Sequence, residues 1–112
     1  MNFELKKEDI KQIDIPQRHM ACMMTRSILE NGDQLGSMQR HEPFRDEDSG
    51  WRFFGVTDDL ATFKPDVDAS FVCVEVAANY CPEIIPLIEM PVGTLLSREN
   101  RNEPLELYTQ DN

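Results

Sequence analysis

The sequence has little basic charge, and this shortage excludes two classes of partner. Its 112 residues contain 11 Lys and Arg against 21 Asp and Glu, which gives a formal net charge of −10. Binding to the phosphates of nucleic acids or of anionic lipids needs clustered cations. No apolar run in the sequence approaches the roughly 20 residues of a membrane-spanning helix. We therefore expect no nucleic-acid partner and no membrane partner.

Metal and cofactor motifs are also missing. The two His and three Cys show no paired spacing of the kind that holds zinc. The five glycines form neither GxGxxG nor GxxxxGK, so no phosphate-binding loop is visible. The acidic stretch that begins at Asp46 starts like a calcium loop, but it has Thr57 at the position where such a loop needs a bidentate Glu. We therefore expect no metal ion and no cofactor.

Catalytic nucleophiles are equally scarce. Cys22 and Cys73 lie in apolar runs, where cysteine behaves as a small hydrophobic residue. Cys81 precedes Pro82 at a possible helix start, where a thiolate would be stabilised, but no residue is identifiable as its base. Ser49 has no glycine two residues before it and does not match GxSxG. We expect a protein that is not an enzyme and that has three free thiols.

Nothing in the sequence indicates export. The first residues include no apolar segment followed by a small-residue cleavage site, so no secretory signal is visible. An odd number of cysteines without close spacing suits a reducing compartment. We therefore expect a cytoplasmic protein.

The apolar segments are short, and breaker residues separate them. A chain of this length has room for one domain. The pattern predicts strands at 20–25, 35–42, 51–54, 71–77 and 94–98, and an edge strand at 105–108. It also predicts an amphipathic helix at 3–12, helical turns at 27–30 and 58–63, and a short or irregular helix at 83–89. A loop is expected at 44–50. The segment 71–77 is apolar on both faces except at Glu75, which predicts a central strand. We expect an α+β fold, a single small domain with a mainly antiparallel sheet and a few short helices.

Acidic residues are concentrated in the second half of the chain. Residues 1–45 carry seven basic and seven acidic side chains, whereas residues 46–112 carry four basic and 14 acidic ones. Seven of these acids lie between Asp46 and Asp68, a segment that also contains Trp51, Phe53, Phe54 and Phe63. One interpretation is a set of solvated loops around a hydrophobic strand, and the other is an acidic face for a basic protein partner. Under the second interpretation, the partner-binding residues are Asp46, Glu47, Asp58 and Asp59.

Three segments together carry a family resemblance, namely DSGWRFFG at 48–55, CPEIIPL at 81–87 and MPVG at 90–93. With them, the sequence from about Met20 to Arg98 resembles the immunity protein 33 family of bacterial polymorphic toxin systems. The family pattern falls on Arg40, Asp48, Ser49, Gly50, Trp51, Arg52, Phe53, Gly55, Pro91, Gly93 and Arg98. The resemblance implies a small α+β domain that neutralises a toxin encoded beside it, with no catalytic role for these residues. It divides the chain into an N-terminal helix and connector at 1–18 and an immunity-protein-33-like domain at 19–112.

Two functions are open at this point. The first is toxin neutralisation by stoichiometric binding through an acidic surface. The second is a non-catalytic regulatory or ligand-binding accessory domain unrelated to toxins. A toxin gene directly beside the gene of this chain would favour the first, and a metabolic operon would favour the second.

Two residues of the DSGWRFFG segment have predicted structural roles. Trp51 begins an aromatic strand after a Ser-Gly turn, and we expect its indole to be buried. Asp48 either accepts a charge-assisted hydrogen bond from Arg40, Arg52 or Arg98, or caps only its own turn through backbone N–H groups.

Overall fold

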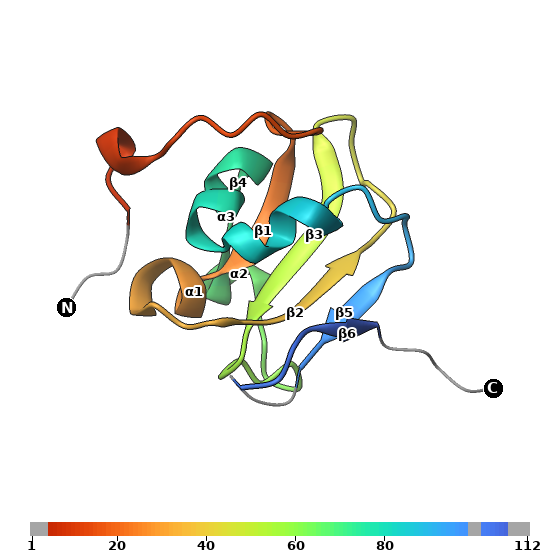
Figure 1. Ribbon diagram of the computed structural model, residues 1–112. Helices are drawn as coiled ribbons and strands as arrows, with labels where there is room; N and C mark the ends of the chain where they lie inside the picture. Colours follow the sequence, from red (N-terminus) through yellow and green to blue (C-terminus); the bar gives the residue numbers. More distant parts are fainter. Residues whose placement is uncertain (1–4, 99–101, 108–112) are drawn as a thin grey trace.

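One mixed sheet forms the centre of the protein (Figure 1). The structure is a computed structural model that describes residues 5–98 and 102–107. Within these residues the strands are β1 (Ala21–Thr25), β2 (Leu35–Arg40), β3 (Asp48–Gly55), β4 (Ala69–Cys73), β5 (Leu95–Ser97) and β6 (Glu106–Leu107). Their order in the sheet is β4-β1-β3-β2-β5-β6, and only the β1–β3 pair is parallel. The expected α+β class with a mainly antiparallel sheet is confirmed.

The helices are short and connect or cover the strands. They are η1 (Lys7–Asp9), α1 (Arg26–Asn31), α2 (Pro65–Asp68), α3 (Val74–Tyr80) and η2 (Pro82–Leu87), of which η1 and η2 are 3₁₀-helices. Figure 1 shows α3 and η2 packed on the same face of the sheet. The other face, which carries Arg52, Phe54 and Phe71, is called the open side below.

A row of side chains across four strands forms the main core. Met24, Phe53, Met38 and Leu96 are neighbours in register on β1, β3, β2 and β5, and each is at most 4% exposed. Ile84 and Ile88 bury their side chains in the same cluster from the η2 side. Alternation along the strands therefore sends one set of side chains to the helices and the other set to the open side.

The open side has a smaller apolar cluster at one end. Met23, Phe54 and Ala69 are buried there, and the ring of Phe63, from the loop after β3, packs edge-on against Phe54 at 5.2 Å between centroids. The remainder of this side includes Phe71, which is 54% exposed. The loop after β3 thus covers only part of the open side.

The segment 71–77, expected as one central strand, is divided between two elements. β4 ends at Cys73 and lies at the edge of the sheet, and α3 begins at Val74. Val74, Ala77 and Ala78 are all fully buried at helical spacing. A short apolar run does not distinguish a strand from a buried helix by periodicity, which explains why this prediction was wrong.

The helix expected at 3–12 was also a wrong prediction for the described residues, where only the single turn of η1 forms. The backbone of this segment is bonded to polar side chains of α3. Leu5 N–H donates to Tyr80 Oη at 2.7 Å, Lys11 N–H to Asn79 Oδ1 at 2.8 Å, and Ile13 N–H to Glu75 Oε2 at 2.9 Å. These tertiary hydrogen bonds replace those that a helix would make internally.

The other predicted elements differ less from the structure. The strand at 20–25, the helical turn at 27–30, the irregular helix at 83–89 and the strand at 94–98 are confirmed as β1, α1, η2 and β5. The edge strand at 105–108 is present as β6, although Tyr108 lies outside the described residues. Residues 58–63 form no helix, since only a turn at 60–62 lies there, and α2 begins after it at Pro65. β3 begins at Asp48, within the expected loop, and β2 ends at Arg40.

Candidate functional site

Asp48 and Arg52 form a buried ion pair at the edge of the open side. The Asp48 carboxylate, on a residue that is 1% exposed, accepts hydrogen bonds from both terminal nitrogens of Arg52 at 2.9 and 2.8 Å. It also accepts from Gly50 N–H at 2.9 Å and from Phe44 N–H at 3.2 Å. Both predicted arrangements are therefore present together, with Arg52 as the cation and the turn capped by backbone donors.

These contacts determine the protonation state of Asp48. Burial by itself would raise the pKa of this carboxyl group, but the hydrogen bonds from Arg52, Gly50 and Phe44 outweigh burial and lower its pKa to about 2. With four donors on its two oxygens, the carboxylate has no free position for a general-base role.

Arg40 and Trp51 join β2 and β3 to the segment after η2. Arg40 donates to the carbonyl oxygens of Ser49 at 3.1 Å and Met90 at 2.7 Å, and its guanidinium lies 5.6 Å from the centre of the Trp51 ring. The Trp51 indole N–H donates to the Ile88 carbonyl at 3.0 Å. Trp51 is fully buried, as expected, and stacks on Phe53.

Glycines of the family pattern stand at positions of two kinds. Gly50 and Gly93 have φ values of +88° and +97°, which favour glycine for backbone reasons, and a Cβ at Gly50 would also collide with the His41 carbonyl oxygen. Gly55 leaves room for neighbouring side chains, because a Cβ there would collide with the Asp33 carboxylate and Ser27 Oγ.

The remaining polar residues of the pattern make internal contacts. Ser49 is 1% exposed, and its hydroxyl accepts from Trp51 N–H at 3.2 Å. Arg98 donates to Glu83 Oε2 at 2.7 Å and to the Glu103 carbonyl at 3.2 Å. The structure thus brings Arg40, Arg52, Asp48 and Trp51 together around β3, whereas Arg98 pairs separately beside η2.

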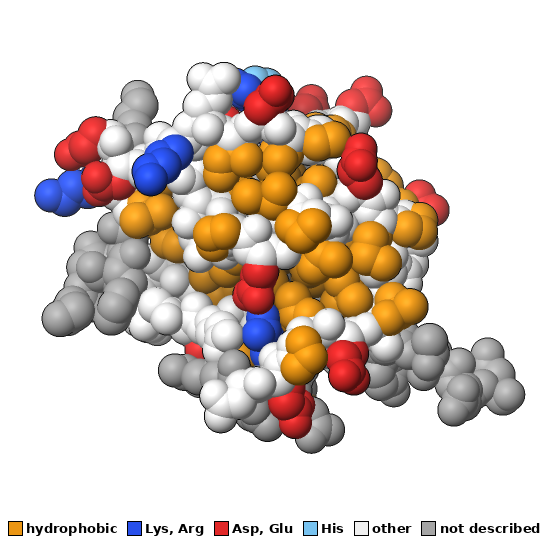
Figure 2. Space-filling model, in the orientation of Figure 1, with side chains coloured by type: hydrophobic (Ala, Val, Ile, Leu, Met, Phe, Trp, Pro, Cys, Tyr) orange, Lys and Arg blue, Asp and Glu red, His pale blue; other side chains and the backbone are white. Residues whose placement is uncertain are grey.

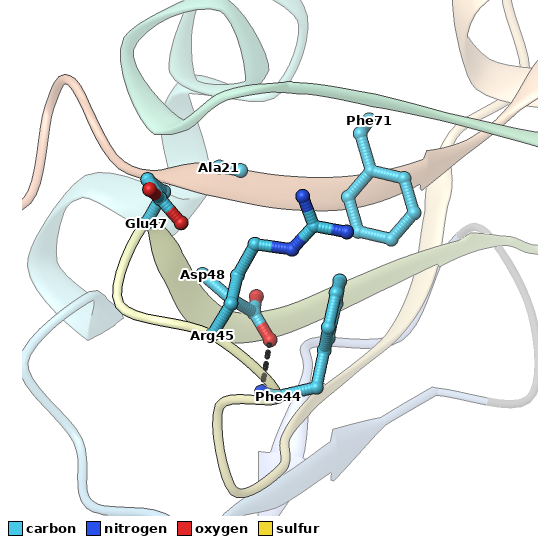
Figure 3. Close-up of a pocket in the computed structure, with 6 residues that line it drawn as sticks. All are labelled: Ala21, Phe44, Arg45, Glu47, Asp48 and Phe71. Atoms are coloured by element: carbon cyan, nitrogen blue, oxygen red, sulfur yellow. Dashed lines mark hydrogen bonds between the residues drawn. The ribbon is translucent and has the colours of Figure 1, made fainter.

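Two phenylalanines and Arg45 border a hollow on the open side (Figure 3), and Arg52 lies beside both rings. Phe44 and Phe71 are 57% and 54% exposed, and their rings meet edge to face at 5.8 Å. The guanidinium carbon of Arg52 lies 5.8 Å from each ring centre, and that of Arg45 lies 4.6 Å from the centre of Phe44. The hollow has a volume of about 250 Å³ and is lined by Ala21, Phe44, Arg45, Glu47, Asp48 and Phe71. We call it the Phe44–Phe71 pocket.

The pocket has the chemistry of a binding surface. Exposed aromatic rings beside arginine are the residue types that dominate binding energy at protein interfaces. Asp48 is fully bonded inside it, while the exposed Glu47 supplies a carboxylate at the rim. Sequence reasoning missed Phe44, Arg45 and Phe71, because Phe44 lay in an expected loop and Phe71 in an expected central strand.

The four acids predicted to bind a partner do not form one cluster. Asp46 and Glu47 precede β3, and Asp58 and Asp59 follow it. The eight residues of β3 lie between the two pairs, which are therefore at opposite ends of this strand. Asp58 accepts hydrogen bonds from Gly55 N–H at 2.6 Å and Ser27 Oγ at 2.9 Å, so its carboxylate has an internal role.

The cysteines are three free thiols, as expected, and two are deeply buried. Burial raises the pKa of Cys22 far above its ordinary value and that of Cys81 to about 12. Both are therefore neutral thiols near pH 7, which suits packing and not nucleophilic chemistry. Across the described ranges, no group of three or more His, Cys, Asp or Glu side chains could hold a metal ion, and no helix is long and apolar enough to cross a membrane.

Comparison with known proteins gives one result. The model of the immunity protein Imm33 domain matches residues 22–108, so the match begins near the start of β1 and continues beyond Arg98, where the sequence resemblance was expected to end. No curated protein and no solved structure matches the chain. The match covers most of the sequence, including every residue of the DSGWRFFG segment and the Phe44–Phe71 pocket except Ala21. The chain belongs to the Imm33 immunity protein family.

Proposed function

We propose that this protein neutralises a toxin by stoichiometric binding, through the open side of the sheet around the Phe44–Phe71 pocket. The family indicates a toxin-immunity role. The single observation that supports this surface is the pair of half-exposed phenylalanine rings in edge-to-face contact, with the guanidinium groups of Arg45 and Arg52 beside them. The protein acts by occupying the toxin surface, and no residue of the pocket performs chemistry.

The opposite face also presents hydrophobic side chains, as Figure 2 shows for the side that carries α3 and η2. There, however, Ile85, Leu87 and Met90 are partly buried because they pack against the main core. Their remaining surface is a continuation of the core, whereas Phe44 and Phe71 each expose more than half of their surface. Phe44 and Phe71 are therefore apolar side chains of the open side whose surface a partner could still remove from water.

Exposed acids lie toward both ends of β3, and with the net charge of −10 they favour a basic toxin. Asp46 and Glu47 lie at one end of β3, and Asp59 and Asp66 lie in or beyond the loop at its other end. All four are exposed. Charges at the rim of an interface chiefly raise the association rate and make it sensitive to salt.

The pocket can be tested by protection from a toxin. A toxin domain encoded beside this chain, produced alone, should arrest growth, and co-production of the wild-type chain should restore it. Phe44→Ala should abolish protection or weaken binding by about tenfold or more, because an aromatic anchor is lost from the centre of the interface. Val92→Ala, which shortens an exposed side chain in the turn between η2 and β5, outside the pocket, is the control and should protect fully. Equal protection by both variants would contradict the proposed surface.

The acidic rim can be tested by association kinetics. Asp46→Asn, Glu47→Gln and Asp59→Asn together should slow association with a basic toxin by about tenfold at low salt, and flatten the salt dependence. The control carries the same charge change on exposed residues of the N-terminal segment, Glu8→Gln, Asp9→Asn and Asp14→Asn. Stopped-flow measurement at two salt concentrations separates the two sets. Equal rates, with greater aggregation of the first variant, would show that these acids serve only to keep the protein dispersed.

A further inference from the structure

β4 is an edge strand without the usual protection against pairing. Its sequence, ASFVC, contains no charged residue and no proline, and its register with β1 is regular at all five positions. Edge strands of natural proteins are normally protected by lysine, proline, a bulge or a covering element. In the described part of the chain, no strand lies on the far side of β4.

The hydrogen-bonding pattern identifies the backbone groups at this edge. Val74 N–H donates to the Met20 carbonyl at 2.9 Å, which continues the antiparallel β1–β4 ladder by one pair. Hydrogen-bonded and non-hydrogen-bonded pairs alternate along such a ladder. The pair of Met23 and Phe71 is therefore non-hydrogen-bonded, and the N–H and C=O of Phe71 point away from β1, toward the open edge.

The side chain of Phe71 lies beside these outward backbone groups. It is on the open side, with its ring against that of Phe44 at 5.8 Å. A strand added to β4 would run about 4.8 Å from it, which puts the added side chains of the same face in contact with Phe71. The edge and the Phe44–Phe71 pocket thus form one continuous surface.

The acidic charge of the chain and of residues near β4 indicates which kind of segment could bind to this edge. Asp66, in α2 just before β4, is exposed. Near the other end, the exposed Glu47 lines the Phe44–Phe71 pocket together with Phe71 of β4. A second copy of a chain with a net charge of −10 would be repelled. An extended segment with basic residues at its ends would be attracted.

We propose that an extended segment of the toxin adds a strand to β4, pairs with the outward N–H and C=O of Phe71, and places an apolar side chain against Phe71 and Phe44. Main-chain hydrogen bonds then contribute affinity, and the pocket contributes specificity. This inference rests on the proposed function and specifies how the same surface binds.

The test compares Phe71→Pro with Phe71→Ala. Both substitutions remove the ring, but only proline removes the outward N–H, which the ladder with β1 does not use. The dissociation constant for the toxin domain encoded beside this chain should be about tenfold or more higher for Phe71→Pro than for Phe71→Ala, the order expected when an interface loses one main-chain hydrogen bond.

Hydrogen exchange on the wild-type protein gives a second measurement, which stands even if Phe71→Pro does not fold. The Phe71 amide should exchange at least about tenfold more slowly in the complex than in the free chain, because its N–H becomes bonded to the added strand. The Val72 amide, which points to β1, is the internal control and should be slow in both states.

The possible outcomes separate the inference from the proposed function. A complex that forms without slowing exchange at Phe71 overturns strand addition and leaves toxin binding in place. Absence of both a complex and growth protection contradicts the proposed function and the inference with it. Concentration-dependent dimers of the free chain that protect the Phe71 amide would show that the occupant of this edge is a second copy, and would overturn the proposal of a toxin segment.

Discussion

Replacing Trp51 with alanine is expected to lower the free energy of unfolding by about 4 kcal/mol, in the range found for fully buried tryptophans. The side chain is 0% exposed, and it stacks on Phe53 with 5.9 Å between ring centres. It also carries the hydrogen bond to the Ile88 carbonyl and the contact with the Arg40 guanidinium. The substitution therefore leaves a cavity and removes the link between β3 and the segment after η2.

Circular dichroism should follow this unfolding, because the variant loses the one tryptophan of the chain and with it the indole fluorescence. The melting temperature should fall by about 15 °C or more. Trp51→Phe is the matched control, since it keeps an aromatic ring but cannot donate to the Ile88 carbonyl, and it should cost less. If Trp51→Ala kept normal stability and lost only toxin binding, Trp51 would be an interface residue and its structural role would be wrong.

The sequence predicted the inner strands better than it predicted β4, at one edge of the sheet. The runs that became β1, β3 and β5 are short, apolar and bounded by polar or breaker residues, so their length alone favours strands. Residues 69–80 have no breaker, and the change from β4 to α3 at Val74 depends on tertiary packing. Three buried side chains of α3 fill the space above the sheet, which local preference does not indicate.

The Asp48–Arg52 pair shows how far the candidate site could be predicted. In a regular strand, residues four apart lie about 13 Å from each other on the same face, too far for a hydrogen bond. Gly50, with its positive φ, bends β3 between them, and the register with β1 shifts at the same place. The sequence left open whether Asp48 bonds to an arginine or only caps its own turn, and this bend brings Arg52, one of the three candidate arginines, within reach.

The contact between Phe44 and Phe71 was beyond sequence reasoning for a different reason. It joins a loop to an edge strand across 27 positions of the chain, and no periodic pattern relates the two residues. Both rings are exposed because the loop after β3 covers only part of the open side. The position of that loop depends on tertiary packing, which the sequence pattern does not indicate.

Asp48→Asn is expected to lower the free energy of unfolding at pH 7 by about 3 kcal/mol, because it leaves the Arg52 guanidinium without its counter-charge in a site where the Arg52 side chain is 12% exposed. The neutral amide would also direct an NH₂ group at donors that now point to a carboxylate oxygen. Urea unfolding measures the change. Asp46→Asn, at an exposed neighbouring position, is the control and should change stability by less than about 0.5 kcal/mol.

The lowered pKa of Asp48 also predicts that the free energy of unfolding decreases as the pH falls. The pKa of Asp48 is lowered from 3.8 to about 2 in the folded protein, so the unfolded chain takes up a proton first as the pH falls. The contribution of Asp48 is therefore complete above about pH 4 and is lost between about pH 4 and pH 2, and it amounts to about 2 kcal/mol for a pKa shift of this size.

Other carboxyl groups also titrate in this range, so the measurement is the difference in free energy of unfolding between wild type and Asp48→Asn at pH 7, 4 and 2.5. The stability gap between the two proteins should shrink at the lowest pH because protonation removes from the wild type the charge that the variant already lacks. A gap that stays constant down to pH 2.5 would show that folding does not lower the pKa of Asp48, and would contradict stabilisation of the ionised carboxylate by Arg52, Gly50 and Phe44 alike.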